Sequence, residues 1–217
     1  MSIENEQTLA TYDKTAQIYL DNTIAHDSAR PEHAREKREK LAEKIHAAFE
    51  TLPEGAKVLE IGAADGDNSK ILESFGYDVT ASDVAPAFVA ACKKQGLKTI
   101  KFNVLKDEFP ADLSGILCWR VFVHFTREDI ADALARIYNA LQPGGRFMFN
   151  VIDRETHDCD AEMKDFSGEY HMGAERYYAY YRKEEIEEMI AKTQFKTVRE
   201  WHENGGHNDW WCFVLEK

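Results

Sequence analysis

The chain is poor in the features that mark secreted, metal-binding and membrane proteins. Its 217 residues include only four cysteines, and no two of them have the close spacing of a zinc knuckle or a CxxC redox pair. We interpret them as reduced thiols of a cytosolic protein. No apolar run approaches the length of a membrane span, and the N-terminus lacks the basic and apolar regions of a signal peptide. These absences predict a cytoplasmic protein with no membrane partner.

Positive charge is also scarce. The chain has 27 Lys and Arg against 39 Asp and Glu, which gives a formal net charge of -12. A phosphate backbone would be repelled by such a protein unless its basic residues were gathered on one face, and the sequence shows no basic stripe. We therefore do not expect nucleic acid as a partner.

What the chain does have is enough apolar material, 44% of its residues, to build one sizeable core. Residues 28–50 have the period of an amphipathic helix, and strand-like and helix-like runs then alternate as far as Val151. This alternation predicts an α/β fold with a mostly parallel sheet and helices on both faces. The expected strands are 57–61, 78–82, 98–102, 114–119 and 146–151, and the expected helices are 68–74, 87–94 and 128–141.

The alternation stops after Ile152. Residues 153–182 show no regular period and are polar and aromatic, which is typical of a functional loop, so we expect a substrate lid there. A helix over 183–193 and two strand-like runs around Asn204-Gly205-Gly206, a hairpin signal, complete the chain. With no repeat and no boundary, we expect one domain over 1–217, its first 52 residues forming an N-terminal helical segment.

The most informative segment, residues 58–67, reads as a buried strand that runs into a small-residue turn and then a helix. Backbone N–H groups in such a turn can approach a ligand closely. A dinucleotide fingerprint would need glycine where this chain has Ala64 and Asp67. Three carboxylates around the loop, those of Glu60, Asp65 and Asp67, would also repel a pyrophosphate. S-adenosylmethionine, which carries a sulfonium and an ammonium group and no phosphate, fits better; the alternative is a tight turn with acidic capping residues and no ligand.

Two further strand ends carry polar side chains. Asp83 ends the second expected strand, where a carboxylate can accept hydrogen bonds from both ribose hydroxyls, although capping the helix that begins near Pro86 would also explain it. Asn103 ends the third strand and could bind the adenine edge through its amide, or could end the strand for turn reasons. Together with the loop, these residues predict a ribonucleoside ligand.

These residues resemble the class I S-adenosylmethionine-dependent methyltransferases, particularly their small-molecule group, whose chains often begin with a Tyr-Asp-Lys-x-Ala-x-x-Tyr segment. Here that segment is residues 12–19. The resemblance covers nearly the whole chain, and its ordered set of motifs is specific although no single motif is decisive. The other matching stretches are residues 58–66, 79–83, 102–104, 116–125 and 141–147. The resemblance implies a Rossmann-like methyltransferase fold, a seven-stranded sheet whose last strand, residues 209–216, is antiparallel.

The resemblance also implies how the site is divided. It places Glu60, Gly62 and Gly66 beside the methionyl part of the cofactor, Asp83 at the ribose and Asn103 at the adenine. The other cofactor contacts that we expect are Tyr19, Ala64, Val84 and Val104.

The chain departs from the family pattern at two points. Ala64 stands where the family usually has glycine, which narrows the loop without blocking it. The fourth strand ends in Cys-Trp-Arg-Val, at residues 118–121, and lacks the Asn/Asp-Pro-Pro-aromatic signature of methyltransferases that act on DNA bases or glutamine. Those substrates are disfavoured.

Methyl transfer mainly requires that the acceptor lone pair be aligned with the methyl group. An amine or hydroxyl acceptor must also lose a proton, and His124, just after the fourth strand, is the candidate base because its unperturbed pKa lies near neutrality. The alternative is a histidine that caps a loop or packs beside the cofactor.

Contacts with the acceptor are expected from Arg120, His157, Tyr178 and Tyr180. Tyr178 and Tyr180 would share one face of a strand, and packing or a homodimer contact would explain them as well as substrate binding does. A metal site from His157, Asp158 and His171 matches no strong spacing pattern, so we expect no metal.

The sequence thus predicts S-adenosylmethionine-dependent methyl transfer to an oxygen or nitrogen of a small molecule. Two alternatives stay open: a methyltransferase for a protein or RNA substrate, and a catalytically silent cofactor-binding domain that keeps the fold.

Overall fold

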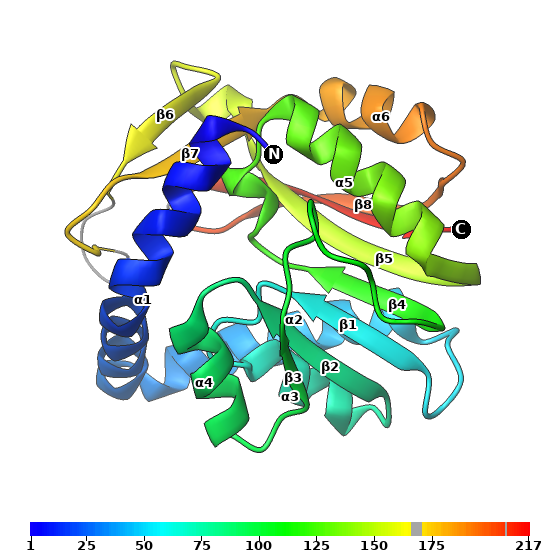
Figure 1. The fold of residues 1–217 in the computed structure, drawn as a ribbon, viewed down its shortest axis with the longest axis horizontal. Helices are drawn as coiled ribbons and strands as arrows, with labels where there is room; N and C mark the ends of the chain where they lie inside the picture. The colour runs from blue at the N-terminus through cyan, green and yellow to red at the C-terminus, as the bar shows by residue number, and fades with distance from the viewer. Residues whose placement is uncertain (166–170, 207) are drawn as a thin grey trace.

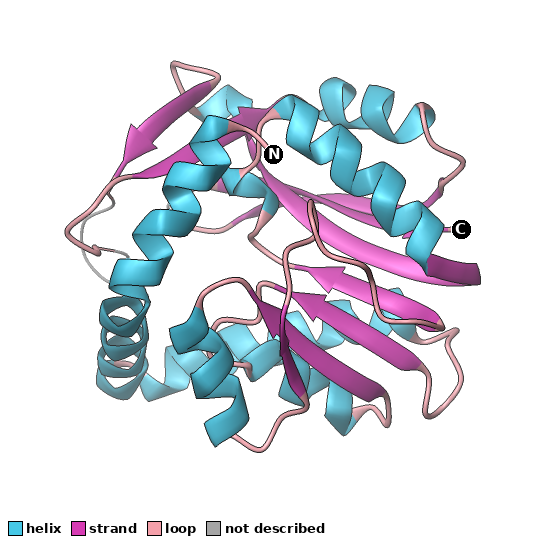
Figure 2. Ribbon diagram, viewed as in Figure 1, coloured by secondary structure: helices cyan, strands magenta, loops and turns pink. Residues whose placement is uncertain are grey.

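The computed structural model describes residues 1–165, 171–206 and 208–217, which form one twisted sheet with helices packed on it (Figures 1 and 2). The helices are α1 (Ile3–Ala29), α2 (Pro31–Phe49), α3 (Asp67–Ser74), α4 (Pro86–Lys94), α5 (Arg127–Ala140) and α6 (Lys183–Ala191). The strands are β1 (Lys57–Ile61), β2 (Asp78–Asp83), β3 (Thr99–Lys101), β4 (Leu113–Cys118), β5 (Leu141–Asp153), β6 (Ala161–Lys164), β7 (Arg176–Tyr181), β8 (Lys196–Asn204) and β9 (Asp209–Glu216). Two short 3-10 helices cover Phe122–His124 and Arg154–Thr156.

The strand order confirms the expected fold class. Strands β3, β2, β1, β4 and β5 lie side by side and are parallel. Beyond β5 comes β9, which runs antiparallel to it, and then β8, which forms the expected hairpin with β9. This is a Rossmann-like sheet with an antiparallel C-terminal strand.

Helices cover the sheet on both faces. On one face, Leu59 of β1 and Phe147 of β5 belong to a core cluster that also contains Ile130 of α5 and Ile186 of α6. The other face packs against α2 and α3, whose buried residues in the second cluster include Ile45, Phe49, Ile71 and Leu72. Because both faces are covered, β1 and β2 are buried along all of their length after the first residue.

Segment 153–182 contains more regular structure than its sequence predicted. Strand β7 extends the sheet by pairing in parallel with the end of β5, and β6 pairs antiparallel with β7. Tyr178 and Tyr180 share one face of β7, as expected, while Ala179 and Tyr181 face the other core cluster. The prediction that the segment lacks regular structure is wrong for these strands, because alternating aromatic residues are buried on both faces of β7. Its role as a substrate lid stays a prediction, and residues 166–170 lie outside the described part.

The N-terminal segment forms two helices. Ser2 caps α1 by accepting the Asn5 backbone N–H at 3.1 Å, and its hydroxyl donates to Asp129 of α5 at 2.6 Å. Pro31 occupies the first turn of α2, where a missing N–H costs nothing, so α1 ends and α2 begins at that point. Helix α1 contacts α4, β7 and the 3-10 helix after β4. In Figure 1 it lies on the side of the sheet toward which the carboxyl ends of β1 and β4 point.

The structure also describes the state of the cysteines and the length and composition of the helices. All four cysteines are free, and Cys92, Cys118 and Cys212 are buried. Within the described ranges, no helix combines the length and the apolar composition that crossing a bilayer requires.

Candidate functional site

A cleft of about 900 Å³ opens at the carboxyl ends of β1, β2 and β4. Its walls come from the loop after β1, the ends of β2 and β4, helices α1 and α2, and the tip of the β8–β9 hairpin. In open α/β sheets, ligands bind outside the carboxyl ends of the strands, at the point where the strand order reverses. Here the order reverses between β1 and β4, so the cleft lies where the topology places a ligand.

Glycine is required at two positions of the loop after β1. Gly62 has φ +76°, and a Cβ there would clash with Cγ2 of Val121. Gly66 has φ +88°, and a Cβ there would clash with Cδ1 of Leu97. Ala64 lies between them and also has a positive φ, +47°. This left-handed conformation costs an alanine about 1–2 kcal/mol. The backbone at position 64 therefore keeps a conformation that suits glycine, although the residue is alanine.

Asp83 joins this loop to the end of β2. Its carboxylate accepts the backbone N–H of Ala64 at 3.1 Å and that of Ala85 at 3.0 Å. The residue at the N-cap of α4 is Ala85, so the alternative in which Asp83 itself caps that helix is wrong. Burial raises the pKa of Asp83 to about 6, against the opposing effect of these hydrogen bonds. The group is therefore largely ionised at neutral pH and lines the cleft.

Two expected cofactor contacts lie behind the wall of the cleft. Glu60, which is 1% exposed, accepts hydrogen bonds from the Ser69 hydroxyl at 2.5 Å and the Asn68 amide at 3.0 Å. Burial raises its pKa to about 7. Gly66 is the N-cap of α3 and packs against Leu97. Neither residue is among those that line the cleft, so both shape the loop from beneath.

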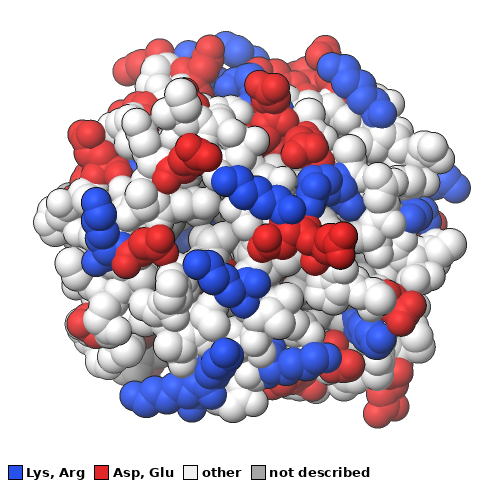
Figure 3. Space-filling model, in the orientation of Figure 1, with Lys and Arg blue, Asp and Glu red and all other residues white. Residues whose placement is uncertain are grey.

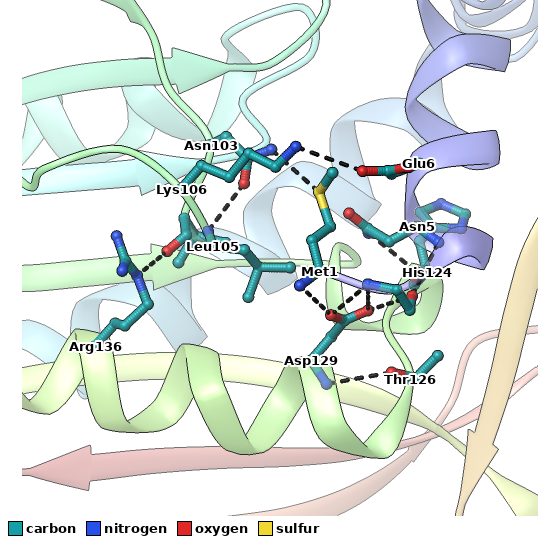
Figure 4. A network of polar contacts seen from close by, with 12 residues as sticks. Met1, Asn5, Glu6, Asn103, Leu105, Lys106, His124, Thr126, Asp129 and Arg136 are labelled. Atoms are coloured by element: carbon teal, nitrogen blue, oxygen red, sulfur yellow. Dashed lines mark hydrogen bonds and ion pairs between the residues drawn. The ribbon is translucent and has the colours of Figure 1, made fainter.

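A small hollow of about 50 Å³ lies beside the cleft at the end of β3. Asn103, Val104 and Val84 line it, as do Gly62 and Asp83, which it shares with the cleft. The Asn103 side-chain oxygen accepts the Leu105 backbone N–H at 2.9 Å, so the structure shows the turn role that the sequence left open. Figure 4 shows its amide nitrogen pointing at the Met1 sulfur, 3.6 Å away.

Tyr19 of α1 lines the cleft opposite the loop and meets the ring of Phe88 edge-on, with centroids 5.6 Å apart. The structure therefore brings together, around one cleft and its hollow, the expected cofactor residues other than Glu60 and Gly66. The members of this group are Tyr19, Gly62, Ala64, Asp83, Val84, Asn103 and Val104.

His124 lies at the cleft in the 3-10 helix after β4 and is 8% exposed. Its Nδ1 lies 2.7 Å from the Tyr177 carbonyl oxygen, which can only accept, so Nδ1 carries the proton. Its Nε2 then accepts from the Tyr12 hydroxyl, 3.0 Å away. Burial lowers the pKa of His124 to about 3. An imidazolium would be desolvated there, so this environment disfavours proton uptake by His124, and its role as a base stays a prediction.

Tyr12 is a cleft residue whose role the sequence analysis missed. Its hydroxyl donates to His124 and lies 3.3 Å from Nη1 of Arg176, which can only donate. Arg176 is 1% exposed and lies over the Tyr12 ring at 5.6 Å. Burial raises the pKa of Tyr12, and the Arg176 charge opposes that rise. The motif at residues 12–19 was the available signal, although only Tyr19 was assigned from it.

Of the four expected acceptor residues, only Arg120 lines the cleft. Tyr178 and Tyr180 are packed in the core, 7% and 0% exposed, which agrees with the packing alternative. His157 stacks on Tyr180 with ring centroids 3.6 Å apart, and the Tyr180 hydroxyl donates to Glu162 at 2.5 Å. His157 and Tyr180 therefore support β6 and β7, whereas Tyr178 meets the ring of the cleft residue His124 edge-on, with centroids 4.8 Å apart.

Two ion pairs close the side of the cleft formed by α2. Arg38 pairs with Asp67 at the start of α3, and Lys44 pairs with Glu203 on the hairpin. The partners are distant in sequence and no local pattern links them, so sequence reasoning could not find them.

No three His, Cys, Asp or Glu side chains group closely enough to hold a metal ion in the described part of the chain. Of the residues weighed for a metal, His157 stacks on Tyr180, and His171 pairs with Asp165 at 3.0 Å.

Comparison with known proteins finds several that are similar to this chain. A family model described as a methyltransferase domain matches residues 33–200. A ubiquinone biosynthesis O-methyltransferase of Xylella fastidiosa (strain 9a5c) is 32% identical over 109 residues, which cover 46% of this chain and 43% of that protein. The match therefore spans less than half the length of that relative.

Solved structures show the same fold at low identity. An S-adenosylmethionine-dependent methyltransferase from Clostridium acetobutylicum has a TM-score of 0.69 at 14% identity, over 91% of this chain and 98% of that one. The 1,6-didemethyltoxoflavin-N1-methyltransferase of Burkholderia thailandensis, solved with 1,6-didemethyltoxoflavin and S-adenosylhomocysteine, has a TM-score of 0.63 at 21% identity, over 95% and 89%. With this shared fold and a family model that matches most of its length, the chain belongs to the methyltransferase-domain family.

Proposed function

We propose that this chain transfers a methyl group from S-adenosylmethionine to an oxygen or nitrogen of a small-molecule acceptor. The observation that carries the proposal is the buried Asp83 carboxylate, which faces the cleft beside a loop of glycine-type backbone. A carboxylate at this position can accept hydrogen bonds from both ribose hydroxyls, and its negative charge would repel a phosphate group. The named relatives act on small molecules, one in ubiquinone biosynthesis and one on 1,6-didemethyltoxoflavin.

The chemistry of the donor set fits S-adenosylmethionine. Asp83 would hold the ribose, and the hollow lined by Asn103 and Val104 would take the adenine. Asp65 of the loop lines the cleft, where its charge favours a ligand with ammonium and sulfonium groups. When bound, S-adenosylmethionine would supply an electrophilic methyl group, and the protein's task would be to align the acceptor with it.

We propose a positioning role for His124 in place of general base. A group with a pKa of about 3 gains little by accepting a proton at neutral pH. Neutral His124 instead fixes the Tyr12 hydroxyl, which donates to it and receives a hydrogen bond from Arg176. The Tyr12 oxygen keeps one lone pair with which to orient an acceptor O–H or N–H in the cleft. An acceptor that still carries its O–H or N–H, and whose proton is acidic enough to be lost to water as the methyl group is transferred, suits such a site best.

The proposed setting is the cytoplasm, in agreement with four free cysteines. On the face that Figure 3 shows, Lys and Arg lie among Asp and Glu over most of the surface, which supports a partner other than nucleic acid. A homodimer stays a prediction.

Methyl transfer from labelled S-adenosylmethionine to a panel of small phenols, carboxylic acids and heteroaromatic amines tests the proposed function. We expect label to move to at least one acceptor class and to be lost in Asp83→Ala. Label that moves only to added protein or RNA would show that the substrate class is wrong.

A further inference from the structure

Arg120 lines the cleft and has an unusual backbone conformation. It follows β4 closely and has a left-handed backbone, with φ +62°. Its N–H donates to the side-chain oxygen of Asn150 at 2.7 Å, and Asn150 is fully buried on β5. Strained backbone of this kind persists where surrounding contacts enforce it, and it concentrates at ligand sites. The structure therefore holds Arg120 in a costly conformation that aims its side chain at a defined place.

The Arg120 side chain lies against the indole ring of Trp210. The Arg120 guanidinium carbon lies 5.1 Å from the ring centroid of Trp210, which is 5% exposed on β9. Stacking on the ring face fixes the plane of the guanidinium and leaves its edge for hydrogen bonds. Its Nε is buried and has no hydrogen-bond partner among the described residues. No ion pair in the described part of the chain includes this side chain either.

Three carboxylates along the cleft are engaged by other groups. Glu203 pairs with Lys44, and Asp67 pairs with Arg38. Asp83 accepts two backbone N–H groups. Arginine presents five N–H donors in a planar fork that matches a carboxylate, and these donors have no counterpart among the carboxylates of the cleft. A half-buried cation with this geometry is therefore able to receive an anion from outside the chain.

The position of the Arg120 guanidinium indicates whether it would contact the cofactor or the methyl acceptor. The residues proposed for adenosine lie at the ends of β2 and β3, on one side of β1. Arg120 lies over β9, which is the second neighbour of β4 on the opposite side. Adjacent strands are about 4.8 Å apart, so the guanidinium lies well away from the adenosine side. The wall on this side also carries Trp119, and Tyr12 and Phe88 line the cleft further along.

We propose that Arg120 binds a carboxylate of the methyl acceptor, and that the acceptor is a planar aromatic acid. This inference rests on the proposed function, because it assigns the acceptor's side of the same cleft. Arg120 then selects the acceptor by its charge, and Tyr12 and His124 orient the group that receives the methyl.

The test measures binding of 4-hydroxybenzoate and of its neutral isostere, 4-hydroxybenzamide, by titration calorimetry with S-adenosylhomocysteine present. Wild type is compared with Arg120→Asn, because asparagine tolerates a left-handed backbone. Arg199→Asn is the matched control, since Arg199 also stacks on an indole, that of Trp201, at 5.4 Å and does not line the cleft. Wild type and Arg199→Asn should bind the acid about 10- to 100-fold more tightly than the amide, and Arg120→Asn should bind the two alike.

Three results would overturn the proposal. The first is equal binding of acid and amide by wild type, and the second is a preference that survives in Arg120→Asn. The third is an Arg120→Asn variant that loses affinity for S-adenosylhomocysteine but not for 5′-methylthioadenosine, which lacks the carboxylate, since Arg120 would then hold the cofactor's own carboxylate. Binding of S-adenosylhomocysteine to wild type reports separately on the proposed function, so the two can fail independently.

Discussion

The backbone N–H of Ala64 donates to Oδ2 of Asp83 at 3.1 Å, which joins the loop after β1 to the end of β2. One contact thus holds the only positive-φ alanine described in the chain and the carboxylate proposed for the ribose. A loop fixed in this way is shaped before any ligand arrives, which lowers the cost of ordering it on binding.

Replacing Ala64 by glycine should stabilise the protein by about 0.5–1 kcal/mol. The left-handed conformation costs alanine about 1–2 kcal/mol, and glycine's greater freedom in the unfolded chain offsets roughly half of the gain. Urea denaturation followed by circular dichroism measures the difference. The matched control is Ala63→Gly, because Ala63 is buried next door and has no positive φ, so it should destabilise. If both variants are destabilised alike, the left-handed conformation at Ala64 is wrong.

Affinity for S-adenosylhomocysteine should fall as the pH drops below about 6. Burial raises the pKa of Asp83 to about 6, and only the ionised form can accept from both ribose hydroxyls. The affinity is therefore highest above that pKa and falls on acidification, with the dissociation constant rising up to about tenfold per pH unit. Titration calorimetry from pH 5 to pH 8 measures the dependence.

Asp83→Asn is the control for this dependence, because it cannot ionise. Its amide oxygen can accept one of the two N–H groups of Ala64 and Ala85, and its amide nitrogen would face the other. Its weaker binding should lack the loss of affinity below pH 6, and any dependence that remains near pH 7 belongs to Glu60, whose pKa burial raises to about 7. A wild-type affinity that stays constant over the same range would exclude Asp83 as the titrating contact.

Tyr12→Phe and His124→Ala should each lower turnover by about 10²-fold, the usual cost of a misplaced reactant, and should leave cofactor affinity nearly intact. Since His124 acts through the Tyr12 hydroxyl, the double variant should be no slower than either single one. The comparison needs turnover at saturating S-adenosylmethionine for the four proteins.

The pH–rate profile separates this positioning role from general base catalysis. Because the pKa of His124 is about 3, His124→Ala should keep the pH dependence of wild type. Loss of an acidic limb near pH 6.5 in that variant would instead show that His124 is the base.

The sequence predicted those parts of the fold and site that depend on local pattern. Strand β1 and the turn after it were predictable because a buried strand, small residues and a helix start follow one another directly. Asp83 was predictable as a site residue because the end of a parallel strand fixes where the following side chain lies.

Other features depend on contacts that local pattern does not carry. The first part of α1 shows no continuous apolar stripe, so its extent was not predicted. The hydrogen bond from its capping residue, Ser2, to Asp129 joins residues far apart in the chain. The Tyr12–His124 hydrogen bond joins two segments that meet only in the folded protein. The low pKa of His124 follows from its burial beside β7, whose pairing with β5 the sequence did not predict.

The most direct test of the central claim is calorimetric titration of the wild-type chain with S-adenosylmethionine, S-adenosylhomocysteine and NAD, repeated with Asp83→Ala and Asp78→Ala. Asp78 lies at the opposite end of β2 and pairs with Lys98, so its variant keeps the site intact. The account predicts that both sulfur ligands bind more tightly than NAD, and that only Asp83→Ala weakens them, by about 1.5–3 kcal/mol. Tighter binding of NAD, or an unchanged affinity in a folded Asp83→Ala variant, would contradict it.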